Sequence, residues 1–266
     1  MPFTLAHPAA ILPFRKTRLP LSALIIGTMV PDFGYLTQLT YFISHTIIGI
    51  FSYCIPVGVA VYFFFHYFLK YPFLDLFPDK HSSFLGGFVK SPSVNSFSKF
   101  FFLVVAIALG VATHLTWDSI THIDGWFVQH VAWFNTLLID NDYFQLRVCR
   151  FFQHLSTVSG GALLLFYYFK SLKNRPKQIV AIEHLLKPGT RIAVIMAITV
   201  IGANIAVMLE YSSLRNIHNY FSFRNIIYNF VVTAITIYFP LIVTYSLIWN
   251  VTKLFKNIRR RYAHNG

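Results

Sequence analysis

The chain has 266 residues, of which 56% are hydrophobic and only 12% are charged. Soluble domains carry roughly 25% charged residues, so this composition excludes an ordinary soluble enzyme, a disordered chain and a disulfide scaffold. The net charge of +13 comes from short basic flanks beside apolar runs, which is typical of a polytopic membrane protein. We therefore expect an integral membrane protein whose surroundings are the lipid bilayer, and no nucleic-acid partner.

Five apolar stretches are long enough to cross a bilayer, since a membrane-spanning helix needs about 20 mainly apolar residues. In chain order they are Phe42–Leu69, Phe97–Trp117, Leu155–Leu172, Ala193–Leu209 and Ile226–Trp249. A shorter apolar stretch, Leu19–Val30, precedes them and predicts a buried or re-entrant helix. The predicted fold class is all-α, a polytopic transmembrane helical bundle with about five spans. We expect residues 1–172 to form a metal-site membrane domain, to which residues 173–266 add two transmembrane helices within the same compact unit.

The positions of the basic residues predict the orientation in the membrane, because cytoplasmic loops carry an excess of Lys and Arg. The C-terminal tail from Lys253 onward and the segment Lys170–Arg191 are both strongly basic. We therefore expect a cytoplasmic C-terminus. The segment Ile120–His154 then lies on the outer side.

Histidine and aspartate residues gather at the outer end of the second predicted span. The sequence THLTWDSITH holds His114, Asp118 and His122 at steps of four residues, which places all three on one face of a helix. Imidazole nitrogen and carboxylate oxygen are ligands that zinc accepts. A carboxylate between two histidines can also bridge two ions. This segment therefore predicts a zinc site.

Four further residues reach the same side of the membrane. His45 opens the first predicted span and His154 opens the third, while His7 and Asp32 precede the first. Taken singly, a histidine at a helix end is more often a capping or interfacial residue, and Asp32 suits a helix cap or a turn. As a set, ionisable residues at membrane depth are costly and usually mark function. The predicted metal ligands are His7, Asp32, His45, His114, Asp118, His122 and His154.

Several segments of the sequence, including those that hold the predicted ligands, resemble a known family. The chain is similar to the bacterial membrane family catalogued as domain of unknown function 4184 in the segments MPFTLAHPAA, LPLSALIIGTMVPDFGY, SHTIIGIF, HLTWDSITHIDGW and FQHLSTVSGG. The resemblance covers about residues 1–165. It implies a location in the bacterial inner (plasma) membrane rather than an activity.

A more distant resemblance implies an activity. The order of the histidines and aspartates is similar to that in membrane-bound metal-dependent hydrolases and in the zinc-dependent phospholipase C and single-strand nuclease group. That resemblance implies a mostly helical enzyme in which up to three zinc ions cleave phosphate esters, with Asp118 as the bridging carboxylate. The soluble enzymes use an N-terminal Trp where this chain has Met1, and a Glu where it has Val158. We therefore expect two ions rather than three.

The leading prediction is a membrane-bound zinc-dependent hydrolase that acts on a phosphoester or lipid-like substrate at the outer membrane interface. Asp118 would bridge the ions, and Asp32 would be a ligand or accept the proton of the attacking water. One alternative is a non-enzymatic membrane protein in which the metal is structural or absent. Another is a metal or proton transporter, which needs ionisable residues through the bilayer, where the last two spans offer only Asn204 and Glu210.

Overall fold

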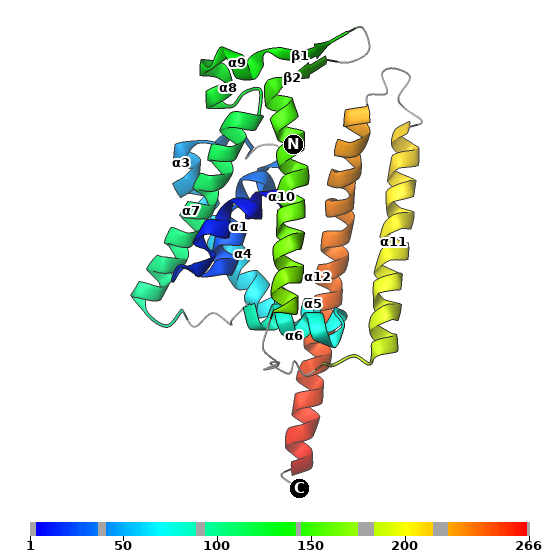
Figure 1. Ribbon diagram of the computed structural model, residues 1–266. Coiled ribbons are helices and arrows are strands. Elements are labelled where there is room, and N and C mark those ends of the chain that lie inside the picture. The colour runs from blue at the N-terminus through cyan, green and yellow to red at the C-terminus, as the bar shows by residue number, and fades with distance from the viewer. Residues whose placement is uncertain are drawn as a thin grey trace. The chain divides into compact units, whose positions relative to one another are not determined.

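The computed structural model describes residues 4–36, 41–88, 94–141, 145–174, 184–214 and 223–264. Within these residues the protein is nearly all helical, with one antiparallel hairpin in which β1 (Leu137–Asp140) pairs with β2 (Gln145–Arg147) (Figure 1). The predicted all-α class is confirmed to that extent. The 3-10 and π-helical segments are η1 (Thr4–Lys16), η2 (Val30–Leu36), η3 (Ile50–Cys54) and η4 (Phe65–Leu69). The α-helices are α1 (Leu21–Gly27), α2 (Tyr41–Ser44), α3 (Ile47–Gly49), α4 (Ile55–Phe64), α5 (Lys70–Leu76), α6 (Asp79–Phe88), α7 (Phe97–Thr121), α8 (Trp126–His130), α9 (Ala132–Asn135), α10 (Val148–Lys173), α11 (Pro188–Leu214) and α12 (Phe223–His264).

Four helical stretches among the described residues are long and apolar enough to cross a membrane. They are Ile47–Leu76, Phe97–His130, Pro188–Met208 and Thr233–Ala263. The predicted count of about five is not confirmed, because the stretch Leu155–Leu172 lies in α10, which is not among the four. Polar side chains near the N-terminal end of α10, together with Lys170 and Lys173 in its last turn, lower its mean hydropathy. The predicted short helix within Leu19–Val30 is present as α1, where Ala23 and Leu24 are fully buried.

The chain forms two compact units. Unit 1 comprises Met1–Tyr62 and Ser91–Lys177, and unit 2 comprises Phe63–Lys90 and Gln178–Gly266. Residues 63–90 thus group with the C-terminal helices, and the division expected at residue 172 stays a prediction. All seven predicted metal ligands belong to unit 1.

In unit 1, helices α1 and α7 pack unusually closely. A Cβ atom added at Gly110 of α7 would lie 2.9 Å from the Cα of Gly27 in α1, so only glycine permits this approach. Buried apolar side chains extend the interface, and they include Leu24, Val30, Leu103, Ala106, Ile107 and Val111. The close approach brings Thr28, directly after α1, beside His114 of α7.

The N-terminal segment η1 packs against α10 and α7 in the same unit. Gly160 of α10 lies against η1, where an added Cβ would be 3.2 Å from the Ala6 carbonyl oxygen. Helices α7 and α10 are joined by a hydrogen bond of 3.1 Å from the Trp117 indole to the Ser156 hydroxyl. Figure 1 shows α8, α9 and the hairpin beyond the ends of these two helices. This packing buries His7 beside α7.

Unit 2 has a buried polar cluster of its own. The Asp75 carboxylate of α5 accepts hydrogen bonds from Trp249 Nε1 of α12 at 2.6 Å and from His184 Nδ1 at 2.8 Å. Arg191 of α11 donates to Asp79 at 2.8 Å. These contacts tie α5 and α6 to the two long C-terminal helices, which lie side by side in Figure 1. Asn204, one of the two polar residues that the last two predicted spans offer for the transporter alternative, is exposed on α11.

Candidate metal centre

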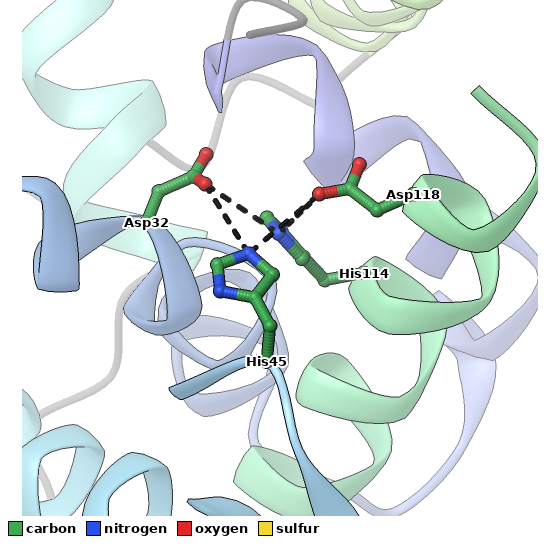
Figure 2. Close-up of side chains that lie close together, drawn as sticks. All are labelled: Asp32, His45, His114 and Asp118. Atoms are coloured by element: carbon green, nitrogen blue, oxygen red, sulfur yellow. Dashed lines mark ion pairs between the residues drawn. The ribbon is translucent and has the colours of Figure 1, made fainter. Parts of the chain in front are cut away.

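Four of the seven predicted ligands lie together. One ligand atom from each of Asp32, His45, His114 and Asp118 falls within 4.8 Å of the other three (Figure 2). Asp32 comes from η2, His45 from the turn before α3, and the other two from successive turns of α7. In Figure 2 the two carboxylates flank the two imidazole rings and point toward a common centre. The fold therefore brings together residues from three separate segments.

The distances within this four-residue group suit ion pairs or a shared cation. Nε2 of His114 lies 3.1 Å from Asp118 Oδ2 and 3.6 Å from Asp32 Oδ1. Nε2 of His45 lies 3.7 Å and 3.8 Å from the same two oxygens. His114 is fully buried, and each aspartate is less than one-tenth exposed. Both rings thus direct the same atom, Nε2, toward both carboxylates.

Hydrogen bonds behind the two rings fix this orientation. His114 Nδ1 donates to the Thr28 carbonyl oxygen at 2.8 Å. The Ser44 hydroxyl donates to the Pro31 carbonyl oxygen at 2.9 Å, so its oxygen accepts from His45 Nδ1 at 3.0 Å. With the hydrogen on Nδ1, a neutral ring presents a lone pair at Nε2. Outer acceptors of this kind orient the histidine ligands of metal sites.

The group concentrates acceptor atoms in a buried space. Asp32 Oδ2 accepts a hydrogen bond from the Thr4 hydroxyl at 2.5 Å, which leaves Oδ1 facing the rings. Burial raises the pKa of Asp32 above its ordinary value. Among the described residues, His114 Nε2 and Asp118 Oδ1 are buried without a hydrogen-bond partner. Burying a polar atom without a hydrogen-bond partner lowers the stability of the folded protein by about 1–3 kcal/mol. A cation in the four-residue group would satisfy His114 Nε2, and the set of two imidazoles and two carboxylates fits zinc.

Asp118 faces two further histidines with its other oxygen. Its Oδ1 lies 3.6 Å from His7 Nε2 and 3.3 Å from His122 Nδ1. The His7 ring stacks on His114 with their centroids 4.0 Å apart, and neither of its nitrogens has a hydrogen-bond partner within the described part of the chain. Burial lowers the pKa of His7 to about 3, so the ring is neutral and can act as a ligand. Asp118 therefore lies between the four-residue group and a second pair of histidines.

The seventh predicted ligand lies apart from the others. His154 is exposed on α10 and is not in the four-residue group. Its neighbour Gln153 is 2% exposed and directs its amide to His122 at 3.4 Å. Neighbouring residues point about 100° apart on a helix, so the rotation of α10 brings Gln153 inward. Sequence reasoning also missed the supporting roles of Thr4 and Ser44, for which the sequence offers no signal beyond the adjacency of Ser44 to His45.

Comparison with known proteins identifies a family without naming an activity. A family model described as a domain of unknown function (DUF4184) matches residues 1–247, a range that includes all seven predicted ligands. No curated protein and no solved structure matches the chain. The predicted resemblance to that family is confirmed, whereas similarity to metal-dependent hydrolases stays a prediction.

Proposed function

The chain belongs to the DUF4184 family, whose description names no activity, and we propose its function from the four-residue group itself. The protein is a membrane-bound, metal-dependent hydrolase that cleaves a phosphoester of a lipid-like substrate. The observation that carries this proposal is the convergence of Asp32, His45, His114 and Asp118 within 4.8 Å. Zinc is the expected ion, because His45, His114 and Asp118 offer three nitrogen and oxygen donors and a catalytic zinc keeps its fourth position open. The site would face the outer side of a bacterial inner membrane, opposite a cytoplasmic C-terminus.

The residues of the group have distinct parts in this chemistry. A divalent cation held there supplies Lewis acidity and lowers the pKa of water. His45 and His114 hold fixed orientations because their Nδ1 atoms are engaged behind the rings. Asp118 has one oxygen toward each set of histidines. Asp32 is the candidate proton acceptor, because Thr4 orients it and its raised pKa brings it closer to the range of an effective general base.

The depth of the site supports a lipid substrate. Helix α7 has 25 residues and is therefore about 37 Å long, which exceeds the roughly 30 Å of the hydrocarbon core. His114 and Asp118 lie in its last turns, where the headgroups of a spanned membrane begin. The exposed Trp126 and Trp133 beyond α7 suit an interfacial aromatic belt. A phosphoester in a lipid headgroup would lie at this level.

Metal content and hydrolysis together test the proposal. Wild-type protein purified in detergent is expected to carry at least about one equivalent of zinc, and Asp118→Ala and His114→Ala are expected to lose it. His154→Ala is the matched control, because it removes an exposed histidine of α10 and is expected to retain the ion. A panel of phosphodiesters and phospholipids is then assayed before and after chelation and zinc restoration. Wild type without metal would contradict the metal centre, and metal without any hydrolysis would contradict the enzyme.

One observation favours a second candidate, a non-enzymatic protein. The 3.1 Å between His114 Nε2 and Asp118 Oδ2 also fits an ion pair with a protonated histidine. In that case the histidines and aspartates would tie helix ends together without a metal. The two candidates differ in their melting behaviour, because a ligand that binds only the folded state raises the melting temperature with its concentration. The second candidate predicts no effect of zinc or chelator.

A further inference from the structure

We propose that His122 is a positioning residue whose ring hydrogen lies on Nδ1, beside Asp118, and that Arg150 and Gln153 of α10 fix it in this state. His122 would therefore not be a metal ligand, although the sequence predicts it as one. This inference rests on the proposed function, because it concerns the same centre. The hydrogen bonds around the His122 ring carry the argument.

On one side of the ring, Gln153 determines the state of Nε2. Arg150 Nη1 donates to Gln153 Oε1 at 2.6 Å. A guanidinium only donates, so this contact fixes the oxygen end of the amide and leaves the NH₂ end toward His122. The amide nitrogen lies 3.4 Å from His122 Nε2. Because an amide nitrogen also only donates, Nε2 accepts and carries no hydrogen.

On the other side of the ring, Thr121 also indicates that the ring hydrogen lies on Nδ1. Its hydroxyl donates to the Trp117 carbonyl oxygen at 3.1 Å, which uses its single hydrogen. The same oxygen lies 3.3 Å from His122 Nδ1, so it accepts from that atom. Two independent neighbours thus place the ring hydrogen on Nδ1.

This orientation is opposite to that of the two rings in the four-residue group. His45 and His114 keep the Nδ1 hydrogen behind the ring and turn a lone pair toward the carboxylates, as metal ligands do. His122 instead turns Nδ1 toward Asp118 Oδ1 at 3.3 Å. A ring nitrogen that carries a hydrogen has no lone pair for a cation. The Nδ1–H is donated to Thr121, and its positive end lies 3.3 Å from Asp118 Oδ1, where it favours the charged carboxylate.

The number of ions follows from this assignment. Without His122, the space beside Asp118 Oδ1 has His7 as its other candidate ligand among the described residues. Zinc sites have three or four protein ligands, so two do not form a tight site. We therefore expect one tightly bound ion, at the four-residue group, instead of the two that the sequence predicts.

Cobalt(II) binding tests the assignment, because the visible spectrum of this zinc substitute depends on its ligands. We expect wild type to bind about one equivalent. His122→Ala should bind the same amount with an unchanged spectrum and an affinity lowered about 10- to 100-fold, as for loss of an outer-shell contact. His114→Ala should lose the ion. A spectrum altered by His122→Ala, or a fall from two equivalents to one, would overturn the proposal.

Nitrogen-15 NMR of histidine-labelled protein reads the ring hydrogens without any metal. We expect the Nδ1–H form of His122 in wild type. Gln153→Glu should move the hydrogen to Nε2, because a carboxylate accepts where the amide donated. Arg150→Met, at a less buried position, should give a mixture of the Nδ1–H and Nε2–H forms, because the Gln153 amide is then no longer held in one orientation. His154 is the internal control and should not change. An Nε2–H form in wild type would overturn the proposal, whereas the expected form in a protein that binds no metal would contradict only the proposed function.

Discussion

Gly110→Ala is expected to weaken metal binding, although Gly110 lies one helical turn from the nearest candidate ligand. The added Cβ would lie 2.9 Å from the Gly27 Cα and still closer to the Leu24 carbonyl oxygen. Ordinary contact begins at 3.4 Å, so α1 must move by at least the difference of 0.5 Å. Overpacking of this kind costs about 1–3 kcal/mol. The gain in helix propensity, about 1 kcal/mol at most, does not offset it.

The displacement reaches the centre through Thr28. The carbonyl oxygen of Thr28, directly after α1, accepts from His114 Nδ1 at 2.8 Å. A shift of 0.5 Å along this bond would lengthen it to 3.3 Å, beyond the usual range of about 2.7–3.2 Å, and so weaken it. His114 would then be held less firmly with its Nε2 toward the carboxylates. We expect zinc affinity to fall by roughly 10-fold, the smaller effect typical of outer-shell losses.

The assay is zinc competition against a coloured chelator, together with melting in detergent. Gly161→Ala is the matched control, because a Cβ at this helical glycine of α10 would meet nothing within 4 Å. The control should keep wild-type zinc affinity and gain up to about 1 kcal/mol of stability from helix propensity. Equal zinc affinities for the two variants would refute the reasoning that links the packing of α1 on α7 to the centre.

Two other substitutions examine the centre and unit 2 separately. Thr4→Val removes the hydroxyl that donates to Asp32 Oδ2, so zinc affinity should fall about 10- to 100-fold. The control is Thr17→Val, at an exposed position, which should leave zinc affinity unchanged. In unit 2, the hydrogen bond from Arg191 lowers the pKa of Asp79. This hydrogen bond therefore stabilises the fold at a pH above the unfolded-state pKa of about 4. The stabilisation is lost as the pH falls through the lower folded-state pKa. The melting temperatures of wild type and Asp79→Asn should therefore differ at neutral pH and converge in acid, and a difference that persists in strong acid would contradict this interpretation.

The sequence by itself determined the features that depend on composition and local spacing. Few charges and long apolar runs predicted a helical membrane protein, because an exposed soluble surface needs more charge than this chain has. The four-residue step from His114 to Asp118 predicted that both side chains share a face of α7, because the helical repeat is a local property. The order of the predicted spans along the chain also predicted that His45 and Asp32 lie on the same side of the membrane as His114 and Asp118.

Only the tertiary structure decided which atoms face one another. The rotation of α10 about its axis turns Gln153 inward and leaves His154 exposed, and no local pattern fixes that rotation. The same holds for the Thr28 carbonyl behind His114, which depends on the approach of α1 to α7. The two nitrogens of a ring differ only through their partners, and two of those partners, the Thr28 carbonyl and Gln153, are distant in sequence from the histidines they contact. Local periodicity therefore placed residues on helices, and packing between helices gave each histidine its orientation.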